Sequence, residues 1–239
     1  MIIDGERLAR EKEAELKPLV KPGLSLGIIV FDDDQAGQTY SRLKAEAGAR
    51  LGIRVIKSNT EKVLEQWNQD KSIQGIMIQK PAYRGEEWER RWEEMVGRIK
   101  REKDVDGLRE DSPFIQATVK AVELLIGDER GKIVVIGRGM VGRKLGQRLG
   151  VENLSSRDEA LRVKTLAADI LISATGREKL ITAEMVKPGA LVIDVGWPKG
   201  DVDFEAVKNI AGKITPVPGG VGPLSVVCLL ENLIKSQYT

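Results

Sequence analysis

The 239-residue sequence contains no histidine and only one cysteine. Without histidine, the chain cannot build a Ser-His-Asp triad, a histidine-ligated zinc site or an imidazole general base. The single cysteine, Cys228, cannot form a disulfide within the chain, and its apolar neighbours predict that it packs in a core. Any catalysis must therefore use lysine, tyrosine, carboxylate or amide side chains, or a cofactor.

An excess of charge of one sign and long apolar runs are also missing. The 38 basic and 36 acidic residues nearly cancel, so no strong electrostatic field exists to hold nucleic acid or an anionic membrane surface. No window approaches the ~18 unbroken apolar residues of a membrane span, and the first residues do not form a secretion signal. These absences predict a cytoplasmic protein that binds neither nucleic acid nor membrane.

Strand-like apolar runs alternate with helix-like amphipathic segments along the chain. This alternation predicts an α/β fold with parallel sheets in two lobes, residues 1–127 and 128–239, separated by a polar break. A single doubly wound sheet is the alternative. We expect strands at about 24–31, 53–57, 75–79, 133–136, 151–154, 169–173, 191–195 and 213–217. We expect helices at about 4–20, 37–51, 60–69, 86–100, 114–126, 141–149, 158–166 and 223–236; the last could pack back on the first lobe.

A glycine-rich loop directly follows the strand expected at 133–136. Gly137, Gly139 and Gly142 form the pattern Gly-x-Gly-x-x-Gly before a helix. Such glycines permit a tight turn and the close approach of a pyrophosphate to a helix N-terminus. The loop therefore predicts a Rossmann-type dinucleotide site, with a plain glycine turn as the alternative.

The residues after the next strand indicate which dinucleotide would bind. An acidic side chain there would bind the ribose hydroxyls of NAD, but the chain has Ser155, Ser156 and Arg157. These side chains can bond a 2′-phosphate, and Arg138 in the glycine loop adds a second positive charge. NADP is therefore expected, with NAD as the alternative, unless Arg157 and Asp158 simply begin a solvated helix. Thr175 and Gly196, at the ends of the following strands, complete the expected cofactor-binding set.

The first lobe offers a possible acid–base group. Tyr40 and Lys44 are four residues apart on an expected helix, so both project from one face. Such a pair is often only two solvent-exposed side chains without a function. Gln79 ends an expected strand, at the edge where parallel sheets bind ligands. Asp104 and Asp106 follow in a short loop; two carboxylates alone make a poor metal signature, so we expect no metal and predict hydrogen bonds to a ligand.

A second rigid loop precedes the last helix. Its sequence, Thr-Pro-Val-Pro-Gly-Gly-Val-Gly-Pro over residues 215–223, fixes φ at the prolines and lets backbone approach a ligand at the glycines. Pro218, Gly219 and Gly220 are therefore expected to bind substrate, with a purely structural turn as the alternative.

Taken together and in order, these motifs resemble the bifunctional methylenetetrahydrofolate dehydrogenase/methenyltetrahydrofolate cyclohydrolase family. The strings Lys-Asp-Val-Asp-Gly over 103–107, Val-Ile-Asp-Val-Gly over 192–196 and Gly-Asp-Val-Asp-Phe over 200–204 belong to the same resemblance. It implies a folate-binding catalytic lobe, a Rossmann lobe and a cleft between them, in a homodimer. It also implies that Tyr40 stacks on folate, that Lys44 is the cyclohydrolase acid–base group, that Gln79 orients Lys44, and that Asp106 anchors the pterin.

The chain also departs from the family pattern. Its glycine loop lacks the usual serine and is one residue shorter, Gly37 replaces a serine that commonly precedes the Tyr40 helix, and the chain is trimmed near 80–86 and 197–200. We expect both activities to survive, since Lys44, Gln79 and Asp106 are present. A dehydrogenase-only folate enzyme and a non-catalytic nucleotide- or folate-binding module remain as alternatives.

Overall fold

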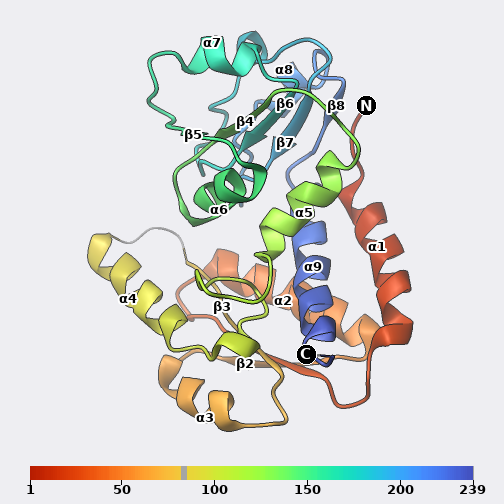
Figure 1. The fold of residues 1–239 in the computed structure, drawn as a ribbon, viewed down its shortest axis with the longest axis vertical. Helices are drawn as coiled ribbons and strands as arrows, with labels where there is room; N and C mark the ends of the chain where they lie inside the picture. Colours follow the sequence, from red (N-terminus) through yellow and green to blue (C-terminus); the bar gives the residue numbers. More distant parts are fainter. Residues whose placement is uncertain (82–84, 239) are drawn as a thin grey trace. The chain divides into compact units, whose positions relative to one another are not determined.

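A computed structural model describes residues 1–81 and 85–238 of the chain (Figure 1). The chain forms two compact units, and the boundary between them falls within three helices. One unit comprises Arg10–Ala117 and Val226–Thr239; the other comprises Met1–Ala9 and Thr118–Ser225. We call them the three-stranded and the five-stranded unit after their sheets.

The three-stranded unit has a parallel sheet in the order β2-β1-β3. Both β1 and β3 are buried along their whole length because they are short apolar runs, which is typical of parallel sheets covered on both faces. Helix α2 packs against β2 and α4 against β3. The elements of the first half of the chain are α1 (Gly5–Leu16), β1 (Ser25–Ile29), α2 (Gln35–Leu51), β2 (Arg54–Ser58), α3 (Leu64–Gln69), β3 (Gly75–Ile78), α4 (Glu86–Gly97) and α5 (Ala117–Ile126), with short 3-10 turns η1 (Lys17–Leu19), η2 (Glu61–Val63) and η3 (Arg101–Lys103).

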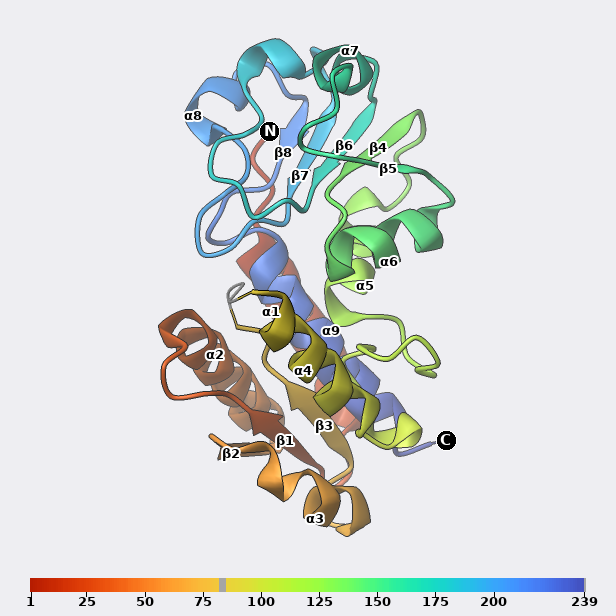
Figure 2. The same cartoon turned by 90° about the vertical axis from the view of Figure 1, so that its left-hand side faces the viewer.

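The five-stranded unit has a parallel sheet in the order β5-β4-β6-β7-β8, whose strands lie side by side in Figure 2. Its central strands are fully buried among aliphatic side chains of the surrounding helices. Its elements are β4 (Ile133–Ile136), α6 (Met140–Leu149), β5 (Asn153–Leu154), α7 (Leu161–Leu166), β6 (Ile170–Ser173), η4 (Ala183–Met185), β7 (Leu191–Asp194), α8 (Phe204–Val207) and β8 (Lys213–Ile214), followed by α9 (Val221–Lys235).

Two separate parallel sheets confirm the expected two-lobed α/β class. The strand expected at 213–217 ends at Ile214, because prolines follow at 216 and 218 and cannot donate to a strand ladder. The short helix α8 and the turn η4 were not expected. Cys228 is fully buried, as predicted. The trimming expected near 80–86 includes residues 82–84, which lie outside the described residues.

Candidate active site and nucleotide loop

Lys44 is buried because it lies in the apolar stripe of α2. Asp34 caps the N-terminus of this helix by accepting a hydrogen bond from the Gly37 amide, and Gly52 ends it in a left-handed conformation. The inward positions of α2 are Gly37, Ser41, Lys44, Ala47, Gly48 and Leu51, which follow the three- and four-residue spacing of one helix face. A lysine in such a stripe loses water on all sides, and only 5% of Lys44 remains exposed.

The Lys44 ammonium group has two neighbours that the sequence predicts for its site, Gln79 and Tyr40. Its Nζ donates to Oε1 of Gln79 at 2.7 Å, and it lies 4.6 Å from the centre of the Tyr40 ring. Gln79 directly follows β3, and its backbone amide donates to the Ile29 carbonyl, which extends the β1–β3 pairing by one residue. The sheet and the helix thus fix the two ends of the Lys44–Gln79 bond.

Burial changes the acid–base chemistry of this lysine. Loss of solvent lowers the pKa of Lys44 from 10.5 to about 8, while the negative charge of Asp106 opposes the shift. At neutral pH the side chain therefore exchanges between a proton donor and a free amine. The charge of Asp106 therefore acts on Lys44, as expected if the two side chains serve one site.

The Asp106 loop is held from several directions. Asp104 is fully buried, and its carboxylate accepts the backbone amides of Leu108 at 3.1 Å and Arg109 at 2.9 Å. The expectation that Asp104 would bond a ligand is thus wrong, because its oxygens hold the loop. From α9, Asn232 donates to the carbonyls of Val105 at 2.9 Å and Ile115 at 2.8 Å.

A carboxylate occupies the space beside Gly37. One oxygen of Asp34 accepts the Gly37 amide at 3.0 Å, while the other is buried and has no hydrogen-bond partner among residues 1–81 and 85–238. A Cβ atom on residue 37 would overlap that second oxygen and would lie 2.9 Å from Cγ of Gln79. Glycine is therefore required here as long as Asp34 keeps its place, and Asp34 borders the Lys44–Gln79 pair.

The glycine loop of the five-stranded unit fits a dinucleotide. Gly137 has φ of +122° and would overlap Ala174 with any side chain, and a side chain on Gly142 would overlap Gly137. Space beside Gly139 is open, and Gly139 begins α6 without a side-chain cap. The free amides at this helix end and the open approach are what a pyrophosphate needs.

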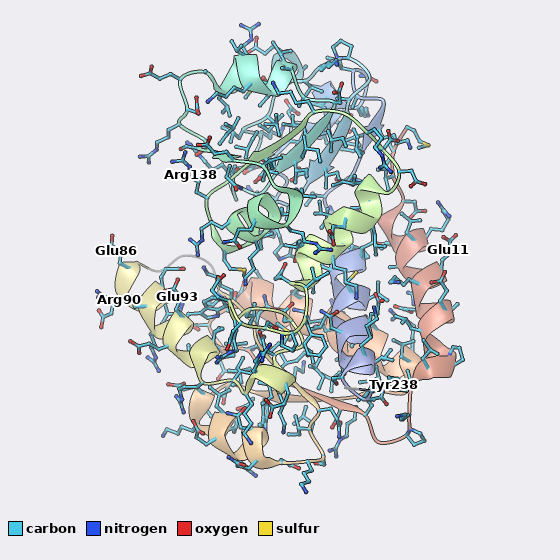
Figure 3. The ribbon with its side chains drawn as sticks, viewed as in Figure 1. Glu11, Glu86, Arg90, Glu93, Arg138 and Tyr238 are labelled. Carbon is cyan, nitrogen blue, oxygen red and sulfur yellow. The ribbon has the colours of Figure 1, made fainter. Side chains whose placement is uncertain are left out.

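The loop after β5 contains Ser155, Ser156 and Arg157, which are expected to contact the 2′-phosphate of NADP. The Arg157 amide donates to the Ser155 hydroxyl at 3.2 Å, and Arg157 is exposed. The acidic Asp158 pairs with Lys164 at 2.8 Å. Arg138 donates to the Asn153 carbonyl at 3.3 Å, and Figure 3 shows its side chain outside the ribbon near β5. Helix α7 begins only at Leu161, so Arg157 and Asp158 precede it.

Two buried aspartates hold the ends of β6 and β7. Asp201 accepts the Thr175 amide at 2.6 Å and the Ser173 hydroxyl at 2.8 Å. Asp194 accepts the Gly196 amide at 2.8 Å, and burial raises its pKa to about 6. Thr175 and Gly196, both expected to contact the cofactor, therefore lie in loops of fixed conformation. Both aspartates lie in sequence motifs of the family resemblance, but no local pattern in the sequence predicts this structural role.

The proline-glycine loop also belongs to the five-stranded unit. The carbonyl of Gly219 accepts the Gly5 amide at 2.9 Å, and a side chain on Gly5 would overlap the Gly220 carbonyl. Pro218 follows a cis peptide bond, and Gly219 has φ of +102°. The structure thus groups Pro218, Gly219 and Gly220 on one rigid loop, while Tyr40, Lys44, Gln79 and Asp106 group in the other unit.

The five-stranded unit has the open glycine loop of a Rossmann-type fold, and the three-stranded unit has a buried lysine, so the chain belongs to the class of two-unit α/β proteins that bind a dinucleotide. Residues 3–106 match the tetrahydrofolate dehydrogenase/cyclohydrolase catalytic domain, and residues 117–239 match the NAD(P)-binding domain of the same family. The chain belongs to the tetrahydrofolate dehydrogenase/cyclohydrolase family.

Curated relatives match nearly the whole chain. The bifunctional protein FolD of Listeria innocua is 36% identical, with 98% of this chain and 96% of the relative covered. The corresponding Bacillus subtilis protein is also 36% identical over the same shares. The Listeria alignment spans 278 positions and this chain has 239 residues, so at least 39 positions, 278 minus 239, have no counterpart here. The trimming is therefore substantial, yet both domains are present.

Solved structures agree with this assignment. The FolD enzyme of Campylobacter jejuni has a TM-score of 0.85 and 30% identity, and covers 100% of this chain and 98% of its own. The FolD of Trypanosoma brucei, solved with NADP cofactor and an inhibitor, has a TM-score of 0.87 and 29% identity, over 99% and 96% of the chains. Within residues 1–81 and 85–238, no helix is long and apolar enough to cross a membrane.

Proposed function

We propose that this chain oxidises 5,10-methylenetetrahydrofolate to 5,10-methenyltetrahydrofolate with NADP and hydrolyses the product to 10-formyltetrahydrofolate. The observation that carries the proposal is the buried Lys44 with Gln79 and Asp106 around it, in a chain of this family. NAD is the alternative cofactor. The proposal assigns residues 1–127 to folate binding and 128–239 to the dinucleotide.

The dehydrogenase step depends mainly on the alignment of the folate ring with the nicotinamide ring, and less on acid–base groups of the protein. A bound NADP would supply the acceptor for the hydride that leaves the methylene carbon of the folate. The chain's own contribution is to hold the pyrophosphate with the amides around Gly139 and the 2′-phosphate with the groups after β5. A fixed orientation of the reacting rings supplies most of the catalysis in such a step.

The cyclohydrolase step requires proton transfers. Water adds to the methenyl carbon, the bond from that carbon to N5 opens, N5 takes up a proton, and one proton is released for each turnover. Lys44 Nζ would accept and donate these protons, because a pKa of about 8 leaves both forms populated near neutrality. Gln79 would orient Nζ, Tyr40 would stack on the folate, and Asp106 would anchor the pterin; Pro218, Gly219 and Gly220 would complete the substrate site.

A time course of the wild-type protein and Lys44→Met tests this proposal. With methylenetetrahydrofolate and NADP⁺, the wild type should reduce nucleotide without accumulating methenyl product. Lys44→Met should reduce nucleotide and accumulate methenyl product in equal amounts. Accumulation by the wild type would favour a dehydrogenase-only enzyme, and absence of reduction with either NADP⁺ or NAD⁺ would favour a binding module.

The homodimer implied by the family resemblance and the cytoplasmic location stay predictions. Light scattering of the purified full chain would give the oligomeric state directly.

A further inference from the structure

We propose that Arg177 determines the preference for NADP over NAD, because it binds the 2′-phosphate together with Ser156. The inference rests on the proposed use of a dinucleotide and adds a residue that the sequence analysis did not select. The observation behind it is a hydrogen bond from Nη1 of Arg177 to the Ser156 hydroxyl at 3.0 Å.

The order of the strands explains why this contact lies at the dinucleotide site. Strands β5 and β6 flank β4 on its two sides, and the glycine loop follows β4. Ser156 is in the loop after β5, where the group at the ribose 2′ position is read in this fold. Arg177, in the loop after β6, therefore reaches from the opposite neighbour strand to that loop, at the same carboxyl edge of the sheet.

The backbone of Arg177 is fixed on a buried support. Its amide donates to Asp201 at 3.0 Å and to the Thr175 hydroxyl at 3.2 Å. Asp201 is fully buried and also accepts from Thr175 and Ser173, so it locks the whole turn after β6. A side chain that starts from a locked turn loses less conformational freedom when it binds an anion.

The charges around Ser156 favour an anion rather than a ribose diol. Within the described part of the chain, no carboxylate forms an ion pair with Arg177. The nearby acidic residue Asp158 pairs with Lys164 at 2.8 Å and accepts the Ala160 amide at 2.9 Å, so its negative charge is offset within its own loop and helix. A phosphate offers the several charged oxygens that an arginine fork and a hydroxyl bind together.

Binding of NADP⁺ and NAD⁺ to the full chain, measured by calorimetry without folate, tests the inference. Arg177→Met should raise the Kd for NADP⁺ by about 10- to 100-fold, the range for a lost bond to a charged group, and leave the Kd for NAD⁺ nearly unchanged. Arg162→Met is the matched control. It removes the same charge from the same unit, but Arg162 bonds the Glu184 carbonyl and is on α7, so both affinities should be unchanged.

A double-mutant cycle with Ser156→Ala shows whether Arg177 and Ser156 bind the same phosphate or whether the charge of Arg177 attracts NADP⁺ independently of Ser156. If the two residues share the phosphate, their effects on NADP⁺ should be less than multiplicative. Equal weakening of NADP⁺ and NAD⁺ by Arg177→Met, or tighter binding of NAD⁺ than NADP⁺ by the wild type, would overturn the inference. Failure of the wild type to oxidise methylenetetrahydrofolate would count against the proposed function alone, since the binding readout is independent of turnover.

Discussion

Because Lys44 is buried, its shifted pKa should make the unfolding free energy of the protein depend on pH. The pKa of Lys44 is about 8 in the folded chain and 10.5 when exposed, so the unfolded state holds the extra proton between these values. Stability must therefore rise as the pH increases through about 8. Between about pH 7 and 9 the gain is roughly 1.3 kcal/mol from this group alone.

Urea unfolding of the wild type and Lys44→Met at both pH values measures this gain. The difference in unfolding free energy between the two proteins should change by that amount in favour of the wild type at the higher pH. A difference that does not vary with pH would mean that Lys44 keeps its ordinary pKa, and would weaken its assignment as the proton carrier.

Asp34 and Gly37 are coupled by sterics. Gly37→Ser should destabilise the protein by about 1–2 kcal/mol, because the new Cβ displaces the Asp34 carboxylate from its helix cap. Asp34→Ser in the same chain vacates this space and keeps a capping hydroxyl. The double variant should therefore be more stable than Gly37→Ser alone, as read from urea midpoints; additive losses would show that the two side chains do not compete for space.

In the turn from β4 into α6, Gly142 is required for folding, whereas Gly139 leaves space for a ligand. Gly142→Ala should lower the melting temperature, because its methyl group would overlap the Gly137 carbonyl. Gly139→Ala should leave the melting temperature unchanged, since nothing lies within 4 Å of the added atom. It should instead weaken NADP⁺ and NAD⁺ alike, because the methyl group takes the space of the pyrophosphate.

Thermal unfolding and nucleotide titration of both glycine variants check this contrast. A Gly139→Ala protein that binds both nucleotides with wild-type affinity would place the pyrophosphate elsewhere. The comparison also complements Arg177→Met, which should discriminate between the two nucleotides.

The same elements show what the sequence could and could not predict. Periodicity located the strands because β1, β3, β6 and β7 are short, uniformly buried apolar runs, and it placed Tyr40 and Lys44 on one helix face. It could not show that Asn232, far along the chain, holds the Asp106 loop, or that Arg177 contacts Ser156. Such contacts depend on tertiary packing, which leaves no local pattern in the sequence.

At the scale of the whole molecule, the two proposed activities make different demands on one chain. Lys44 and Gln79 are in the three-stranded unit, whereas the glycine loop is in the five-stranded unit. The cyclohydrolase step needs no nucleotide, and the dehydrogenase step needs no lysine acid–base group. A variant that loses one activity should therefore retain the other. This should hold even though at least 39 positions of the alignment with the Listeria relative have no residue in this chain.

Mixing two single variants tests this separation. Lys44→Met should produce methenyltetrahydrofolate that it does not hydrolyse, and Gly139→Ala should hydrolyse that product although it binds NADP⁺ poorly. A mixture of the two should form 10-formyltetrahydrofolate after a lag, because the intermediate must leave one molecule and enter another. The wild type at the same concentration should show a shorter lag or none. If Gly139→Ala lacks cyclohydrolase activity while it remains folded, the nucleotide loop is needed for both steps. The proposal that the cyclohydrolase step does not depend on the nucleotide loop of the five-stranded unit would then be wrong.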